Sequence, residues 1–246
     1  MLYLSELLYP DAETSVTYKS KVQVFVTPNP GLVKIRLVSG SLLMNMKGGS
    51  AMCLVNHPAP DFELEGYFKG DFKKYTLSGY RGKWVILLFY PLDFTFVCPT
   101  EVLNFSDAAG QLNKLNCQIF GLSVDSPFVH KAWVDTKREE GGLGGSLNYP
   151  LLSDLNKKAA HDYGILMENE GIALRGLFLI SPEGIVMHST INSLSVGRSV
   201  SEALRVLKAF QFVSSHTGQV CPADWEDGKD TMGANPEDMK KYLASH

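Results

Sequence analysis

The stretch Trp84-Val-Ile-Leu-Leu-Phe-Tyr90 and its continuation Pro91-Leu-Asp-Phe-Thr95-Phe-Val-Cys98-Pro99-Thr100-Glu101 decide the fold. The first seven residues have the length and the β-branched and aromatic content of a strand buried on both faces. Pro91 ends that strand because proline has no N–H for the hydrogen-bond ladder. After a loop, apolar residues recur at helical spacing, at Val102, Phe105, Ala109 and Leu112. The stretch therefore predicts a strand, a loop and a helix.

Cys98 stands where this helix is expected to begin. Pro99 suits the first helical position, because its φ is preset and its missing donor is not needed there. The unpaired N–H groups and the dipole at a helix start favour an anion such as a thiolate. Thr95 carries a hydroxyl able to donate to the sulfur. Two readings stay open on spacing alone: a reactive thiol in a strand-to-helix loop, or a small core hydrophobe.

The composition indicates a globular protein. The chain has 246 residues, 45% of them hydrophobic, which is ample for the core of one large domain or two small ones. A net charge of −3 without long single-sign blocks argues against nucleic acid, and no apolar run is long enough for a membrane span. Four cysteines, with no C-x-x-C pair and no zinc spacing, favour free thiols in a reducing compartment: Cys53, Cys98, Cys117 and Cys221.

Residues 1–58 differ from the rest of the chain. No acidic residue occurs between Glu13 and Asp61, although five Lys or Arg residues do. We interpret this region as a poorly ordered extension or an import signal. It resembles a mitochondrial transit peptide only loosely, so we expect a cytoplasmic protein, with mitochondria as the alternative. Residues 21–27 alternate like a strand. A further alternative is that translation starts at Met44, Met46 or Met52.

A compact domain is expected over residues 59–214. Residues 117–124 form a second buried strand, and the order strand, helix, strand predicts a right-handed parallel unit, with Cys117 structural inside it. Ser126-Pro127 opens a further helix with Phe128, Ala132 and Trp133 inward. The glycine-dense segment 139–146 lacks the ending of a phosphate-binding loop and is interpreted as a mobile surface loop. Residues 174–180 and 185–191 predict a hairpin around the turn 181–184.

Arg175 lies inside an apolar strand, where a guanidinium is costly to bury unless it meets an anion. Its partner is either a carboxylate or the Cys98 thiolate. Arg198 has a weaker claim to a site, since it stands at the start of a helix over residues 200–210. His188 is interpreted as a satisfied core or surface group.

The tail, residues 215–246, repeats the local Val-Cys-Pro of the first site around Cys221. Trp225 and several glycines and prolines predict an irregular segment, and a short helix is expected from Pro236 to Leu243. One thiol at a helix start and another in a partly exposed tail suit thiol–disulfide exchange through a sulfenic acid.

Taken together, four motifs resemble those of a typical two-cysteine peroxiredoxin, from about Ala59 to the C-terminus: Pro91-x-x-x-Thr95-x-x-Cys98 with Glu101, Arg175-Gly-Leu-Phe, Val196-Gly-Arg198-Ser-Val, and Val-Cys221-Pro-Ala-x-Trp225. The resemblance implies a thioredoxin-like α/β fold, with a central mixed sheet flanked by helices and a C-terminal tail. It also implies an antiparallel homodimer, often assembled into a decamer, that reduces hydrogen peroxide and alkyl hydroperoxides with thioredoxin as reductant and without a cofactor or metal.

The same resemblance assigns roles to residues of this chain. Cys98 is expected to be the nucleophile, and Cys221 of the other subunit the resolving cysteine. Thr95 and Arg175 are expected to hold the thiolate and polarise the peroxide. Glu101 is expected to orient the arginines, and Pro91 and Pro99 to shield the pocket.

Two further features follow from the resemblance. Gly141-Gly-Leu-Gly144 and Tyr242-Leu243 resemble paired features linked to over-oxidation, although the family usually has Tyr-Phe at the second site, so Leu243 is expected to pack less firmly. The alternative function is a redox-regulated chaperone or disulfide relay. A glutaredoxin-like reductase is disfavoured by the missing C-x-x-C.

Overall fold

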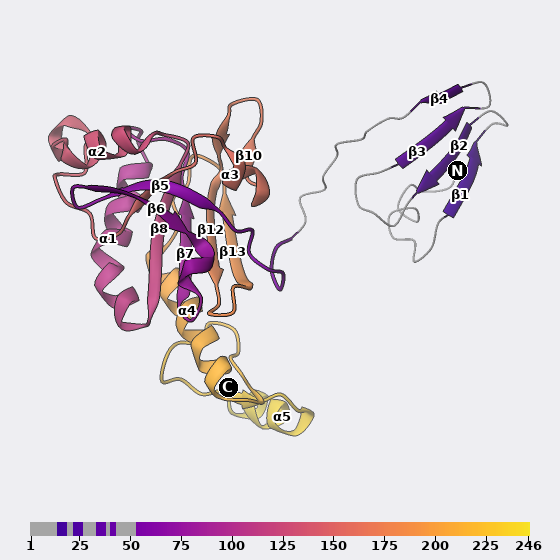
Figure 1. Ribbon diagram of the computed structural model, residues 1–246. Coiled ribbons are helices and arrows are strands. Elements are labelled where there is room, and N and C mark those ends of the chain that lie inside the picture. The colour runs from indigo at the N-terminus through magenta and orange to yellow at the C-terminus, as the bar shows by residue number, and fades with distance from the viewer. Residues whose placement is uncertain (1–13, 19–21, 27–32, 38–39, 43–52) are drawn as a thin grey trace. The chain divides into compact units, whose positions relative to one another are not determined.

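The computed structural model describes residues 14–18, 22–26, 33–37, 40–42 and 53–246 (Figure 1). The chain divides into two compact units, residues 1–53 and 54–246. The second unit begins before Ala59, the residue at which the sequence predicted its start. The segment ahead of Ala59 already forms hydrogen bonds with residues 185 and 186 of this unit. The Asn56 N–H donates to the Val186 carbonyl at 2.8 Å, and Pro58 bridges Ile185. None of the helices in the described parts of the chain is long and apolar enough to cross a membrane.

The first unit contains a four-stranded antiparallel sheet in the order of the sequence. Its strands are β1 (Thr14–Tyr18), β2 (Val22–Val26), β3 (Val33–Leu37) and β4 (Gly40–Leu42). The alternating pattern predicted over residues 21–27 is confirmed over Val22–Val26, and the first and last of the predicted residues lie outside the described ones. The other three strands were not anticipated. The role of residues 1–58 as an extension or import signal stays a prediction.

The second unit is built on a seven-stranded mixed sheet of order β13-β12-β7-β8-β9-β5-β6. The central pairs β7–β8 and β8–β9 are parallel, and the other pairs are antiparallel. This is the expected thioredoxin-like fold. The strands are β5 (Glu63–Phe68), β6 (Asp71–Thr76), β7 (Trp84–Phe89), β8 (Cys117–Ser123), β9 (Leu151–Ser153), β12 (Arg175–Ile180) and β13 (Val186–Asn192).

Strand β7 is the centre of the core, as its sequence predicts. Every residue of it is buried. Because side chains alternate along a strand, its residues divide between two hydrophobic clusters. Ile86 and Leu88 pack with α1 (Cys98–Lys114), α2 (Pro127–Asp135) and α4 (Val200–Ser215), whereas Leu87 and Phe89 pack with α3 (Lys158–Asp162) on the opposite face. The sheet is therefore covered on both sides.

The inward face of α2 differs from the expected one. Trp133 is fully buried, but Phe128 is 71% exposed and Ala132 is also on the surface. The helix buries His130 and Val134 beside Trp133 instead. The sequence analysis did not include His130 among the core residues. Its ring is buried here because it hydrogen-bonds to a buried carboxylate, that of Asp93. The predicted buried face of α2 was therefore rotated relative to the observed one.

The remaining elements are short. The glycine-dense segment is not a free surface loop, because Leu143 is 1% exposed and its N–H donates to the Trp133 carbonyl at 2.9 Å. A side chain at Gly142 would collide with the backbone of Thr136. The predicted terminal helix is confirmed as α5 (Pro236–Ser245). The other elements are η2 (Leu77–Tyr80), η3 (Arg138–Glu140), β10 (Leu166–Met167), β11 (Ile172–Ala173), β14 (Gln219–Val220) and β15 (Met232–Gly233).

Candidate active site

Cys98 is the first residue of α1 and is 0% exposed. The helix thus begins one residue earlier than expected, with Pro99 in its first turn. The residue before the helix, Val97, makes no side-chain cap, but its carbonyl accepts from the N–H groups of Thr100 and Glu101 at 3.1 and 3.3 Å. Pro99 has no N–H, so the start of α1 favours an anion at the sulfur mainly through the helix dipole. Cys98 is thus buried and also lies at a helix start, so both interpretations of it, as a core residue and as a reactive thiol, stay open at this point.

Arg175 reaches both of its candidate partners. One of its nitrogens, Nη1, lies 3.4 Å from Cys98 Sγ and donates to Glu101 Oε2 at 2.7 Å. Its Nε donates to the Leu194 carbonyl at 2.8 Å, which fixes the plane of the guanidinium. Both side chains of the ion pair are almost fully buried. Strand β12 and helix α1, which are distant in sequence, therefore place a guanidinium against the sulfur.

Arg198 completes the cluster and has a larger part than the sequence suggested. Its Nε and backbone N–H each donate to Glu101 Oε1 at 2.7 Å, its Nη2 donates to Oε2 at 3.0 Å, and its Nη1 donates to the Gly176 carbonyl at 2.6 Å. A Cβ at Gly197 would stand 3.3 Å from Glu101, so a small residue suits this close approach. The sequence signal for Arg198 was its place in the motif Val196-Gly-Arg198-Ser-Val, which was quoted without a role for the arginine.

The charges of this cluster favour a thiolate. Two guanidinium groups, which stay protonated in proteins, face one carboxylate, and the sum is one uncompensated positive charge in a buried region. Ionisation of Cys98 brings that sum to zero. Burial alone would raise the pKa of Glu101, but the hydrogen bonds and charge of Arg198, with the charge of Arg175, hold the pKa below its usual value. The carboxylate therefore stays ionised and keeps both arginines oriented.

Thr95 and Pro91 line the same loop in different ways. Pro91 is buried at the end of β7. The Thr95 hydroxyl donates to the Leu92 carbonyl at 3.0 Å, so its proton is not directed at Cys98 in this structure. The loop between them contains a bulky residue, Phe94, in the left-handed region at φ +52°. The sequence did not anticipate this strained backbone.

Cys221 lies in the tail, on the surface of α4. It is half-buried, and its Sγ is 3.9 Å from the Ala209 carbonyl. Burial raises the pKa of its thiol, and the charge of Arg205 opposes that rise. Trp225 is 3% exposed and accepts a hydrogen bond from Arg205 at its carbonyl, at 3.1 Å. The tail is therefore held on α4, and both cysteines of the expected pair are free thiols.

Two other predicted features lie away from this cluster. Cys117 is buried in β8, and burial raises the pKa of its thiol strongly, which fits the structural role. Leu243 is 66% exposed on α5, so its side chain is not packed firmly against the rest of this chain.

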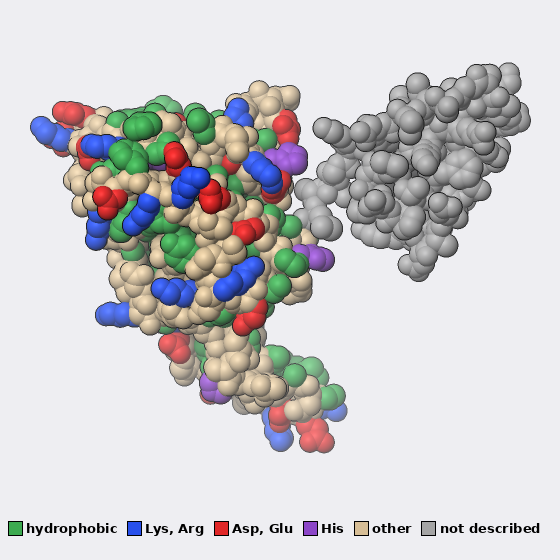
Figure 2. Space-filling view, viewed as in Figure 1, with side chains coloured by type: hydrophobic (Ala, Val, Ile, Leu, Met, Phe, Trp, Pro, Cys, Tyr) green, Lys and Arg blue, Asp and Glu red, His purple; other side chains and the backbone are tan. Residues whose placement is uncertain are grey.

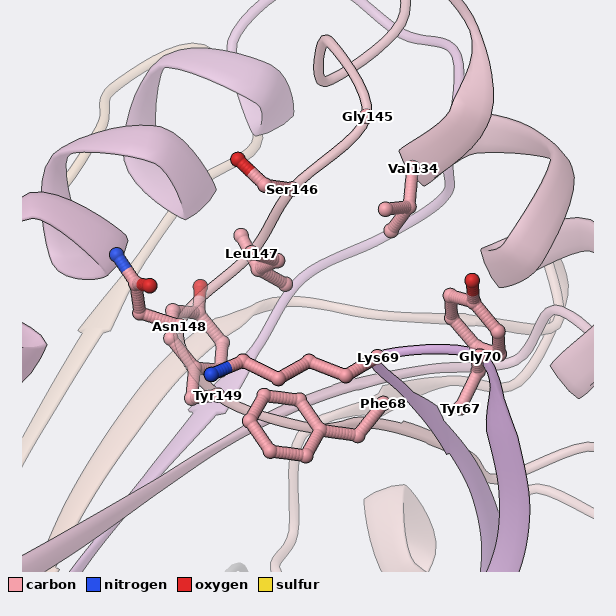
Figure 3. Close-up of a pocket in the computed structure, with 10 residues that line it drawn as sticks. All are labelled: Tyr67, Phe68, Lys69, Gly70, Val134, Gly145, Ser146, Leu147, Asn148 and Tyr149. Atoms are coloured by element: carbon pink, nitrogen blue, oxygen red, sulfur yellow. The ribbon is translucent and has the colours of Figure 1, made fainter.

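A cleft of about 320 Å³ lies between the β5–β6 hairpin and the segment that follows α2 (Figure 3). The side chain of Lys69 extends along Phe68 at its edge, with the ammonium 5.1 Å from the ring centroid. Tyr149 is part of its lining, and the hydroxyl of this residue donates to the Val102 carbonyl in α1 at 3.0 Å. The cleft contains none of the predicted site residues.

Comparison with known proteins identifies relatives along most of the chain. Residues 55–189 match the AhpC/TSA family, and residues 209–245, which include Cys221, match the C-terminal domain of 1-Cys peroxiredoxin. Peroxiredoxin-2 of Bos taurus is 55% identical over 192 residues, which are 78% of this chain and 96% of that protein. The chloroplastic 2-Cys peroxiredoxin BAS1 of Arabidopsis thaliana is 52% identical over 193 residues, 78% of this chain and 72% of that protein.

Solved structures agree with these relatives. The reduced 2-Cys peroxiredoxin of Plasmodium vivax superposes with a TM-score of 0.76 at 39% identity, covering 78% of this chain and all of that one. AhpC of Enterococcus faecalis superposes with a TM-score of 0.65 at 41% identity, covering 70% of this chain and all of that one.

Proposed function

Because the chain belongs to the AhpC/TSA family, and is therefore a thiol-dependent peroxidase of the peroxiredoxin kind, we propose that Cys98 is the residue that attacks the peroxide. The observation that carries this proposal is the contact of Arg175 Nη1 with both Cys98 Sγ and Glu101 Oε2. A buried guanidinium that touches a sulfur and is aimed by a carboxylate stabilises negative charge at that sulfur and at an oxygen bound beside it.

The reaction then follows from the charges. The Cys98 thiolate attacks one peroxide oxygen, the O–O bond breaks, and the sulfur becomes a sulfenic acid. The other oxygen leaves as hydroxide or alkoxide and takes up a proton to become water or an alcohol. Arg175 donates to this departing charge, and the dipole of α1 stabilises it. Glu101 keeps Arg175 and Arg198 aligned, and we propose that Thr95 turns from Leu92 to the bound peroxide.

The test is peroxide consumption in stopped flow by a Cys98→Ser variant. The matched control is Cys117→Ser, because Cys117 is also a buried cysteine of the same unit but lies in β8. Loss of turnover with the first change and retention with the second support the proposal. Undiminished turnover in Cys98→Ser refutes it.

We further propose that Cys221 of a second subunit resolves the sulfenic acid. Its thiol condenses with the Cys98 sulfenic acid, a disulfide forms, and water leaves; thioredoxin then reduces the disulfide by thiol–disulfide exchange. Two features support this: Cys221 is a free thiol, and it is half-buried on the surface of α4. Oxidised protein run without reductant separates the possibilities, since a dimer-sized band that requires both cysteines is the expected result, and an oxidised monomer contradicts it.

Similarity to 2-Cys peroxiredoxins implies assembly into a dimer or a larger oligomer, and we propose an antiparallel dimer that associates into a decamer. Strand β13 supports the dimer because it is an edge strand of the described sheet. Beyond its first residue, Val186, which also bonds residues 56 and 57, its described strand partner is β12. Exposed aromatics support the larger ring: the rings of Phe72 and Phe128 are 5.1 Å apart, and both are exposed. Figure 2 shows hydrophobic side chains on the surface over α2. Sedimentation of Phe128→Asp is expected to leave dimers only, and an intact decamer contradicts the assignment.

The proposed location is the cytoplasm, or the mitochondrion if residues 1–58 direct import. N-terminal sequencing of the native protein distinguishes these, because cleavage near residues 48–52 favours mitochondria. No observation on the described residues favours the alternative role as a chaperone or disulfide relay.

A further inference from the structure

The two halves of the loop between β7 and Cys98 differ in how firmly hydrogen bonds hold them. Its first half ends at Asp93, whose side chain is almost fully buried. The Tyr90 hydroxyl donates to Asp93 Oδ1 at 2.8 Å, and the Asp93 N–H donates to Asp125 Oδ2 at 2.9 Å. Ser123 also donates to Asp125 Oδ2, at 2.8 Å. The end of β7 and the start of α2 are thereby tied together through Asp93.

His130 provides a further bond to Asp93. Its ring is 0% exposed, with Nδ1 2.8 Å from Asp93 Oδ2 and Nε2 3.2 Å from the Leu152 carbonyl. A carbonyl only accepts, so Nε2 carries a proton, and a proton must also lie between Nδ1 and the carboxylate. Burial raises the pKa of Asp93, and the contact with His130 offsets only part of the rise. The two side chains therefore share one proton in a place closed to water.

The second half of the loop, residues 94–97, has few bonds to the rest of the unit apart from the contact of the Phe94 ring with Trp133, because the hydrogen bonds to the Val97 carbonyl come from the first turn of α1 itself. Phe94 is 48% exposed in a left-handed conformation that is unfavourable for a bulky side chain, and Phe96 is 96% exposed. The Thr95 hydroxyl makes one hydrogen bond, to Leu92, and Val97 leaves the start of α1 without a side-chain cap. Opening residues 94–97 would release the backbone strain at Phe94 and break few hydrogen bonds, so this half of the loop opens at a low cost in free energy.

We propose that Asp93 and His130 are positioning residues that form the fixed end of a hinge, so that the loop opens from Phe94 onward and carries Cys98 out while Tyr90 to Asp93 stay in place. This inference rests on the proposed roles of Cys98 and Cys221. Neither residue of the pair hydrogen-bonds to Cys98, whose sulfur bonds Arg175. They act by setting how far and how often the segment opens.

The hinge decides between two fates of oxidised Cys98. In the open loop the sulfenic acid meets the Cys221 thiol, and a disulfide and water form. In the closed loop it meets a second peroxide, which transfers one oxygen to the sulfur to give a sulfinic acid and leaves as water or an alcohol. A firm fixed end favours the closed loop, which favours both the first peroxide reaction and over-oxidation.

The experiment compares wild type with His130→Gln, and uses Tyr90→Phe as a milder change that keeps an aromatic ring. Hydrogen exchange measures the Asp93 amide against the amides of residues 94–97. Mass spectrometry measures the ratio of sulfinic acid to disulfide after peroxide pulses. Loss of one charge-assisted hydrogen bond corresponds to roughly a tenfold change in an opening equilibrium. We therefore expect faster exchange at Asp93, about a tenfold lower ratio of sulfinic acid to disulfide, and a slower first reaction with peroxide. Tyr90→Phe changes each in the same direction by less.

The matched control is Asp154→Asn. Asp154 is as buried as Asp93 and accepts hydrogen bonds from the N–H groups of Ala159 and Ala160 in α3, away from the loop. It is expected to lower the thermal midpoint without changing the ratio. The proposal is overturned if Asp154→Asn changes the ratio as much as Tyr90→Phe does. It is also overturned if the wild-type Asp93 amide exchanges as fast as residues 94–97.

Failure of the proposed function is distinguishable from failure of the hinge. If Cys98 is not the nucleophile, Cys98→Ser retains turnover with peroxide. The difference in hydrogen exchange between the Asp93 amide and the amides of residues 94–97 is measured without peroxide, so it tests the hinge separately.

Discussion

Replacement of Glu101 by Gln tests the electrostatic account most sharply, because two effects oppose each other. Removing the carboxylate leaves two guanidinium groups without an acid, which favours the Cys98 thiolate further. The same change also misaligns the arginines. The amide oxygen of glutamine can still accept at the Oε1 position from Arg198, but its NH₂ then faces the donors of Arg175 and Arg198 that now bond Oε2. Two charge-assisted hydrogen bonds are lost, worth about 3–6 kcal/mol together.

Only part of the lost hydrogen-bond energy raises the activation free energy of the reaction with peroxide. If Arg175 is no longer aimed at the reacting oxygen, the loss of one aligned donor lowers a rate by about 100-fold or more. We therefore expect the rate constant for peroxide to fall about 100-fold in Glu101→Gln, although the ultraviolet absorbance of the thiolate does not decrease. Stopped flow measures the first quantity and a pH titration of absorbance the second. The control is Glu63→Gln, which removes an ion pair with Lys74 on the exposed surface. A Glu101→Gln rate within about threefold of wild type would refute the reasoning, because thiolate formation alone would then explain the activity.

Three other outcomes follow from the same structure. Cys221→Ser is expected to react with the first equivalent of peroxide at the wild-type rate but not to turn over with thioredoxin, as single- and multiple-turnover assays measure. Arg205→Gln removes a hydrogen bond to the Trp225 carbonyl and is expected to change the rate of disulfide formation about threefold to tenfold while the first peroxide step stays constant. In urea unfolding at a series of pH values, the Glu101 ion pairs contribute stability that is complete above its unfolded pKa, about 4.5, and is lost as the pH falls through the lower folded pKa. Glu101→Gln is expected to remove this component of the acid dependence, and an unchanged profile contradicts it.

The core elements of the second unit were predictable because buried strands and helices have characteristic patterns of apolar residues in the sequence. The continuous apolar run of β7 and the helical spacing of α1 each correspond to one buried surface. Prediction was wrong where a polar group is buried in a pair. His130 reads as a surface residue until Asp93 is known to face it, and the predicted face of α2 was rotated for that reason. Pairs distant in sequence leave no local pattern.

The site divides in the same way. Cys98, Glu101 and Arg175 were identified through motifs, and the structure brings them into one hydrogen-bonded cluster. Arg198 was undervalued because a position at a helix start gives a charged residue an ordinary explanation. Thr95 was expected to donate to the sulfur, yet a hydroxyl has one proton, and here the Leu92 carbonyl takes it. The direction of a rotatable hydroxyl depends on backbone geometry, in this case the left-handed Phe94, which sequence spacing does not contain.

The two buried networks together explain how a fully enclosed sulfur can react with a second chain. The Glu101 cluster, with its four accepted hydrogen bonds, ties α1 to the rest of the unit beyond Cys98, and Asp93 fixes the loop before it. Between these anchors lie a strained Phe94 and an uncapped helix start. Opening this short segment exposes Cys98 and separates the Phe94 ring from Trp133 but leaves the rest of the core in place, so its free energy is a small part of that of global unfolding. Disulfide formation therefore requires only local opening, and the strength of either anchor can change its frequency without changing the fold.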